Sequence, residues 1–118
     1  MIQIISSDKE NVIAARITKK VSKNDVEKIH TLIYDIIDKG MKAHFYFELV
    51  DFKGYTLKGF WEDIKVDAAH ISDYGKMAFV GDKDWQKWVA KATDFFTSSE
   101  VRFFELENKD DAQEWINL

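Results

Sequence analysis

Three polar side chains that could take part in proton transfer alternate along one short stretch of the chain. His44, Tyr46 and Glu48 fall on one face of a predicted strand, and Arg102 on the last predicted strand would lie on the corresponding face. Together they would supply the acid, base and cation of general acid–base catalysis. However, a sheet with helices on one side leaves polar residues on its other face for solvent, which accounts for all four. No nucleophile has a base at a recognisable spacing, so we predict no catalytic residues and expect a protein that is not an enzyme.

The sequence also lacks the residue spacings of metal and cofactor sites. Cysteine is absent, and no two of the three histidines have the spacing of metal ligands. Gly81 follows a predicted strand, but it stands without a phosphate loop or a dinucleotide fingerprint around it. Asp82 and Asp84 would repel a phosphate at the helix that follows, so a capped structural turn is favoured there. We predict no metal and no cofactor.

Aromatic side chains are the least ordinary feature of the sequence. Phe60 and Trp61 are adjacent on a predicted helix, and consecutive helical residues point about 100° apart, so both cannot face the centre of the sheet. Trp85 and Trp88 lie on the next predicted helix. The four residues are predicted to line an apolar groove that binds a small ligand. The alternative is that the same rings pack directly against each other as core.

The residue pattern predicts the elements that would position these side chains. Strands are predicted at 2–5, 11–18, 43–50, 76–80 and 101–106, where branched and aromatic residues gather or alternate. The best-marked helix begins at Ser22-Lys23-Asn24-Asp25, which looks like a capping box with Asp in place of Glu, and ends before Gly40. Further helices are predicted at 56–71, at 84–92 and at 110–118.

These elements predict an α/β fold for one domain that covers residues 1–118. Strands separated by single helices favour right-handed crossovers and a mostly parallel sheet, and the opening hairpin adds an antiparallel edge. We therefore predict a mixed, mainly parallel five-stranded sheet with about four helices, in the order ββαβαβα. The helices are expected to pack largely on one face of this sheet, and a homodimer through the exposed face is a further prediction.

Charge and hydropathy exclude several classes of partner. The chain has a net charge of −4, with a net charge of +2 on residues 1–60 and −6 on residues 61–118. Such a protein should repel nucleic acid, whose non-specific affinity depends on neutralising phosphates. No basic leader with a long apolar run and no spanning apolar stretch is found, so we expect a cytoplasmic protein without membrane insertion.

Several short strings resemble the bacterial SpoIIAA-like family. They are Phe47-Glu48-Leu49, Gly54-Tyr55-Thr56, Phe60-Trp61-Glu62-Asp63 and Val80-Gly81-Asp82-Lys83-Asp84-Trp85 with Trp88. The resemblance covers nearly the whole chain. It implies a fold related to STAS domains, which include the anti-sigma-factor antagonists, and to CRAL-TRIO lipid-binding domains.

The two relatives imply different functions. The antagonists are phospho-switches, with a serine in an Asp-Ser-Ser-Gly turn at the start of the helix after the third strand. The corresponding stretch here runs from Asp51 to Thr56 and has no serine, which puts the switch in doubt, and Thr56 is its only aliphatic hydroxyl. The first prediction is therefore a non-catalytic bacterial STAS-like binding or regulatory domain with a small apolar or lipid-like ligand. The alternative is a protein-partner switch controlled by phosphorylation near Thr56, and an enzyme of unknown reaction ranks third.

Overall fold

Short stretches rich in branched and aromatic residues form the strands, because these side chains fit the pleated surface of a sheet. The computed structural model of the chain describes residues 1–5, 7, 9–19, 21–52, 62–64, 74–81 and 100–118. The strands are β1 (Ile2–Ile5), β2 (Val12–Lys19), β3 (Ala43–Phe52), β4 (Tyr74–Gly81) and β5 (Val101–Glu105). The helices are α1 (Lys23–Asp38), the 3-10 helix η3 (Leu106–Asn108) and α4 (Lys109–Ile116).

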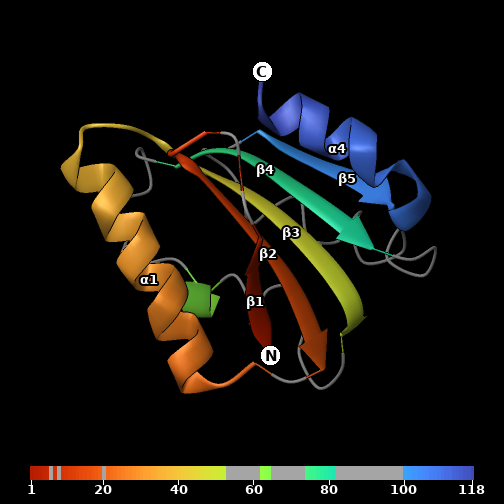
Figure 1. Cartoon of the computed structure of the whole chain (residues 1–118), viewed down its shortest axis with the longest axis horizontal. Helices are drawn as coiled ribbons and strands as arrows, with labels where there is room; N and C mark the ends of the chain where they lie inside the picture. Colours follow the sequence, from red (N-terminus) through yellow and green to blue (C-terminus); the bar gives the residue numbers. More distant parts are fainter. Residues whose placement is uncertain (6, 8, 20, 53–61, 65–73, 82–99) are drawn as a thin grey trace.

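The five strands form one sheet in the order β1-β2-β3-β4-β5 (Figure 1). β1 pairs antiparallel with β2, and every later pair is parallel. The predicted mixed, mainly parallel α/β sheet is therefore confirmed. The letters ββαβαβα name only four strands, but β5 and α4 agree with the strand predicted at 101–106 and the helix predicted at 110–118.

The helices agree with the sequence patterns where the structure describes them. Of the helix predicted at 56–71, residues 62–64 are described and are helical, whereas the helix predicted at 84–92 lies outside the described residues. Within the described ranges, no helix combines the length and the apolar character that crossing a membrane requires.

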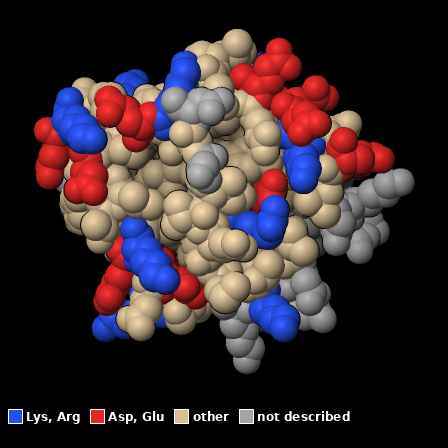
Figure 2. All heavy atoms as spheres, viewed as in Figure 1, with Lys and Arg blue, Asp and Glu red and all other residues tan. Residues whose placement is uncertain are grey.

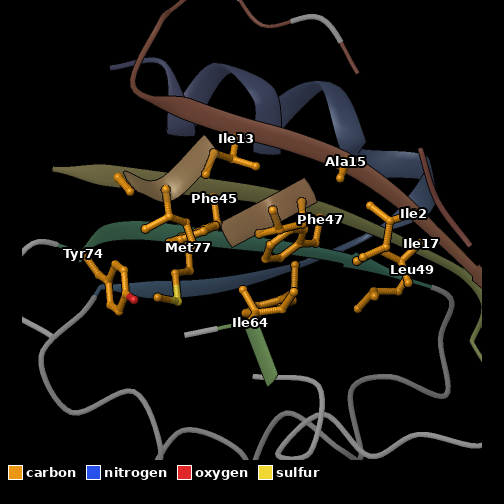
Figure 3. Packing of buried hydrophobic residues seen from close by; sticks show 14 of the residues in the cluster. Ile2, Ile13, Ala15, Ile17, Phe45, Phe47, Leu49, Ile64, Tyr74 and Met77 are labelled. Atoms are coloured by element: carbon orange, nitrogen blue, oxygen red, sulfur yellow. The ribbon is translucent and has the colours of Figure 1, made fainter. Parts of the chain in front are cut away.

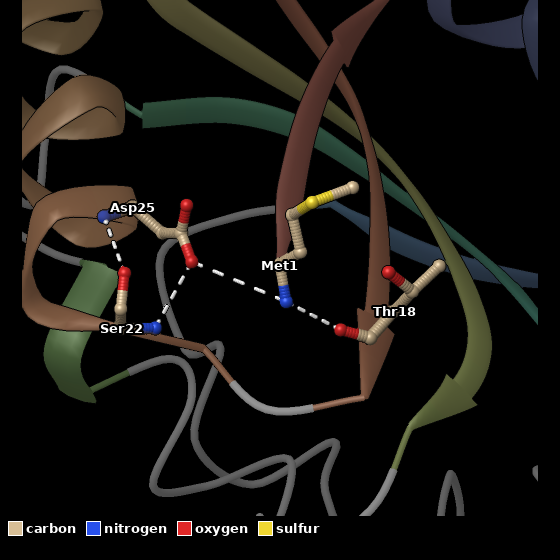
Figure 4. Close-up of polar contacts among 4 residues, drawn as sticks. All are labelled: Met1, Thr18, Ser22 and Asp25. Carbon is tan, nitrogen blue, oxygen red and sulfur yellow. Dashed lines mark hydrogen bonds and ion pairs between the residues drawn. The ribbon is translucent and has the colours of Figure 1, made fainter.

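A capping box starts α1 (Figure 4). The Asp25 amide donates to Ser22 Oγ at 3.1 Å, and the Ser22 amide donates to Asp25 Oδ2 at 3.0 Å. The Met1 nitrogen lies 4.0 Å from the same Asp25 oxygen and also donates to the Thr18 carbonyl. Two amides at the helix start are thus satisfied reciprocally, and a cap of this kind contributes about 1 kcal/mol.

The Asp25 carboxylate makes this cap sensitive to acid. Burial by itself would raise the pKa of Asp25, but the hydrogen bonds from the backbone and side chain of Ser22 outweigh it and hold the pKa below its usual value of 3.8. A carboxyl with a lowered pKa stabilises the fold above the unfolded pKa, and this stability is lost as the pH falls through the folded pKa. The cap therefore weakens only below about pH 4.

One face of the sheet packs under α1. Because side chains alternate along a strand, every second residue of β2 points to this side, beginning at Ile13. The members of this cluster come from all five strands or from the helical residues, and several are labelled in Figure 3. Those from β2 and α1 are Ile13, Ala15, Ile17, Ile29, Ile33 and Ile36.

The opposite face of the sheet packs under α4. Val12 and Ala14 of β2 lie on this side, with Ala78 and Val80 of β4. The covering side chains of α4 are Ala112, Trp115 and Ile116. The expected packing of helices on one face holds for α1 and for residues 62–64, whereas α4 covers the opposite face. A homodimer through this face would have to displace α4. The homodimer stays a prediction, and sedimentation can test it.

Candidate functional site

Aromatic rings form a row across three strands on the α1 side of the sheet. Phe47, Phe79 and Phe103 are register partners on β3, β4 and β5, and their ring centroids lie 5.7 Å and 5.5 Å apart along the row. Phe45 adds a second ring on β3, 5.5 Å from Phe47 and 5.7 Å from Tyr74. Ring pairs at this separation favour tilted and offset geometries. This row, called the aromatic floor below, gives an apolar surface on which other elements can pack.

The helical residues 62–64 lie on this floor. Ile64 is fully buried in the same cluster as Phe45 and Phe47, and it points toward the sheet in Figure 3. His30 Nε2 of α1 donates to the Asp63 carbonyl at 2.7 Å, which ties the segment to α1. Ile64 is thus buried between this floor and α1.

The sequence-predicted site residues lie outside the described part of the chain. These are the four groove residues Phe60, Trp61, Trp85 and Trp88, and the regulatory candidate Thr56. Their assignment rests on the sequence and on the position of Ile64, which is three residues after Trp61 and four after Phe60.

On the α4 side, a polar network joins two strands and a helix. Arg16 Nε of β2 donates to Glu48 Oε2 of β3 at 2.9 Å. Tyr46 Oη donates to Glu48 Oε1 at 2.7 Å, and Gln113 Nε2 of α4 donates to Tyr46 Oη at 3.4 Å. Glu48 is 3% exposed. A buried carboxylate needs such partners, since an unpaired charge in the interior costs several kcal/mol.

This burial corrects the expected role of the polar strand face. Tyr46 and Glu48 are both buried and do not face solvent, and Tyr46 packs with side chains of α4. Arg102 does not join them either, because its guanidinium lies 4.8 Å from the centre of the Trp115 ring. Sequence reasoning missed the Arg16–Glu48 pair, although opposite charges at facing positions of neighbouring strands are a recognised signal. Using that signal requires the register in which Arg16 faces Glu48.

Tyr46 is held in its neutral form. Burial raises the pKa of the Tyr46 hydroxyl far above its ordinary value of 10, and the hydrogen bond to Glu48 raises it further. The hydroxyl therefore stays protonated and donates a hydrogen bond to Glu48 across the whole physiological pH range. This hydrogen bond stabilises the Glu48 carboxylate, and it does not make Tyr46 a general base.

His44 stands apart from the network, at the start of β3. Its Nδ1 accepts a hydrogen bond from the Lys76 amide at 2.7 Å, and the ring lies over Gly75. Burial lowers the pKa of His44 below 6.5, and the positive charges of Lys76, Lys42 and Lys9 lower it further. The unfolded chain then binds the proton more readily, so His44 lowers the stability of the fold as the pH falls below about 6.5.

Comparison with known proteins places the chain in a family. A family model described as SpoIIAA-like matches residues 12–117. The chain belongs to the SpoIIAA-like family. The resemblance seen in the sequence is thereby confirmed.

A solved structure supports the SpoIIAA-like fold. It is an uncharacterized protein of the DUF3478 family with a SpoIIAA-like fold from Shewanella loihica PV-4, and it superposes with a TM-score of 0.65. The two chains are 24% identical, and the comparison covers 98% of this chain and 92% of that one. At this identity the likeness shows the fold alone. The comparison with curated proteins found no match.

The predicted switch residue, Thr56, lies shortly after the third strand, β3. β3 ends at Phe52, and Thr56 follows it by four residues. This is where the antagonists carry their serine according to the resemblance. The family match does not supply the missing serine.

Proposed function

We propose that this SpoIIAA-like chain is a non-catalytic regulatory domain that binds a small apolar or lipid-like molecule. The observation that carries the proposal is the aromatic floor of Phe47, Phe79 and Phe103, on which Ile64 packs. Binding pockets for such ligands are lined mainly by apolar and aromatic side chains. The absence of cysteine fits action in the bacterial cytoplasm.

The predicted groove residues extend this floor. Residues three and four positions apart on a helix share a face, so Trp61 and Phe60 are expected to flank the buried Ile64. Trp85 and Trp88, three positions apart, are expected to form the facing wall. An acyl chain or a flat ring between these walls would then meet aromatic surface on three sides.

Tryptophan fluorescence tests this groove. Titrating the protein with a fatty acid such as lauric acid should shift or quench the emission saturably, because the ligand replaces water around an indole ring. Trp61→Ala should lower the affinity for lauric acid at least about tenfold while the far-ultraviolet circular dichroism stays unchanged, a loss equivalent to about 1.4 kcal/mol of binding free energy.

Trp115→Phe is the matched control. Trp115 lies on α4, on the opposite face of the sheet, so removing its indole should leave the saturable response in place. The groove proposal fails if fatty acids, phospholipids and aromatic probes give no saturable response. It fails equally if Trp61→Ala binds lauric acid as the unchanged protein does.

The second candidate function is a partner switch at Thr56. It is favoured by the family membership and by the place of Thr56 shortly after β3. A phosphate there would add a charge of about −2 at the start of the next predicted helix, where it is tolerated, and could break a partner contact. Thr56→Glu should therefore fold normally and lose a partner that the unchanged protein retains in pull-downs. Thr56→Val, which removes the hydroxyl without adding charge, should keep that partner, and identical recovery by all three proteins would end the switch proposal.

A further inference from the structure

A cavity lies between the β2–β3 surface and the end of α4, on the face opposite the aromatic floor. Its volume is about 200 Å³, and it is partly open to solvent. Ile5, Val12, Ala14 and Ile116 form its apolar lining. An apolar cavity of about 150 Å³ holds a benzene molecule, so this one has room for a six-membered ring with a short substituent.

The polar part of this cavity holds both donors and acceptors, and one acceptor in it lacks a donor. Asn117 lines the cavity, and its buried Oδ1 has no hydrogen-bond partner among the residues that the structure describes. Tyr46 also lines it; its hydroxyl already donates to Glu48 and accepts from Gln113 Nε2, so its oxygen has one acceptor position left. Ser7 and Gln113 complete the polar lining. A buried acceptor without a donor costs about 1–3 kcal/mol, which a ligand that brings a donor would recover.

Charges of both signs lie near the cavity, since Lys76 Nζ donates to the Trp115 carbonyl at 3.5 Å near the end of α4. Ile116 and Asn117 form the C-terminal end of α4, where the helix dipole is negative. Glu48 Oε1 lies 2.7 Å from the Tyr46 oxygen. Arg16 pairs with the other carboxylate oxygen, Oε2, and offsets the charge of Glu48.

The outer surface of α4 adds to this field. Asp110, Asp111 and Glu114 are exposed on α4 beside a single basic residue, Lys109. Figure 2 shows acidic side chains gathered along the upper right edge of the molecule, where α4 lies in Figure 1. Clefts near charge of one sign raise the local concentration of ligands of the opposite sign.

We infer that this cavity binds a small protonated amine, with its apolar body against Val12, Ala14 and Ile116 and its ammonium donating to Asn117 Oδ1 and the Tyr46 oxygen. One donor of the ammonium would satisfy Asn117 Oδ1 and a second the remaining acceptor position of Tyr46, whereas a carboxylate placed there would face both oxygens. This site lies on the other face of the sheet from the groove proposed above and does not depend on it.

A matched series of three probes tests the inference. Benzylamine, benzyl alcohol and benzoate share a ring and differ in the charge of the substituent. Titrations at pH 7, followed by the amide signals in two-dimensional NMR spectra, should show saturable shifts at Ala14, Tyr46 and Asn117 with benzylamine. Benzyl alcohol should bind about tenfold more weakly because it is uncharged and brings one donor, and benzoate should not bind.

Two variants locate the binding. Asn117→Leu should weaken benzylamine binding about tenfold and leave the unfolding midpoint unchanged or higher, because it removes an unsatisfied acceptor. Ala14→Leu should fill the cavity and abolish the shifts, whereas Trp61→Ala should bind benzylamine as the unchanged protein does. The inference is overturned if benzoate binds as tightly as benzylamine, if the shifts map elsewhere, or if no probe saturates. A failure of this kind leaves the lauric acid result untouched, so the two sites are judged separately.

Discussion

Replacing Arg16 by Met is expected to lower the free energy of unfolding by about 3 kcal/mol, because it leaves the Glu48 carboxylate buried without its cation. This value is at the lower end for breaking a buried pair. The reason is that the Arg16 side chain is 42% exposed, so part of the interaction is screened by solvent. Urea unfolding of the variant and the unchanged protein at pH 7 would measure the difference.

Two controls separate charge from packing in this experiment. Arg16→Lys keeps a cation near Glu48 but loses the planar guanidinium, so its loss should be smaller. The double variant Arg16→Met with Glu48→Gln should be more stable than Arg16→Met alone, because the neutral amide can still accept from Tyr46 and carries no buried charge. A loss below about 1 kcal/mol for Arg16→Met would mean that the pair behaves as an exposed salt bridge.

Replacing Gly75 by Ala is expected to lower the free energy of unfolding by about 2 kcal/mol, the usual effect of overpacking a filled site. A methyl group on Gly75 would lie 2.2 Å from Cε1 and 2.4 Å from Nδ1 of the His44 ring. The ring can move aside only by giving up the hydrogen bond from the Lys76 amide. Thermal and urea unfolding would both report the loss.

A double-mutant cycle with His44 tests the cause. His44→Ala removes the ring and leaves room for the methyl group, so Gly75→Ala should cost much less in that background. The coupling between the two changes should exceed about 1 kcal/mol, as it does for residues in direct contact. If the two losses of unfolding free energy are additive, the methyl group destabilises the fold for a reason other than its contact with the His44 ring.

The sequence predicted those elements whose signals are local. The capping box at Ser22 and Asp25 and the helical spacing after it sit within one stretch of chain, so α1 was found without knowledge of its neighbours. The strands were found in the same way, since alternation such as that from Ala43 to Val50 depends only on the strand itself.

The side on which a helix packs is not a local signal. The apolar stripe of Ala112, Trp115 and Ile116 shows that α4 packs on something, but either face of the sheet would satisfy it. A hint was present in the strands. Val12 to Ala15 and Met77 to Val80 are continuous apolar runs, which are typical of strands buried on both faces.

The polar network could not be predicted for a related reason. Arg16 and Glu48 are 32 residues apart, and they meet only because β2 and β3 pair in one particular parallel register. The aromatic row has the same origin, because Phe47, Phe79 and Phe103 come from three strands. The sequence identifies such residues as buried or polar, whereas pairing between distant strands decides which of them meet.

The placement of α4 on its own face also has a consequence for the growing chain at the ribosome. Translation delivers β1 to β4 before α4, so the nascent domain can complete its α1 side while Ala78, Val80 and Tyr46 still lack their cover. During that interval the open side presents apolar surface, which makes a partly folded chain prone to aggregation. The arrival of Trp115 and its neighbours then ends the exposure in a single step. A chain truncated before α4 would therefore leave one face of the sheet without its cover.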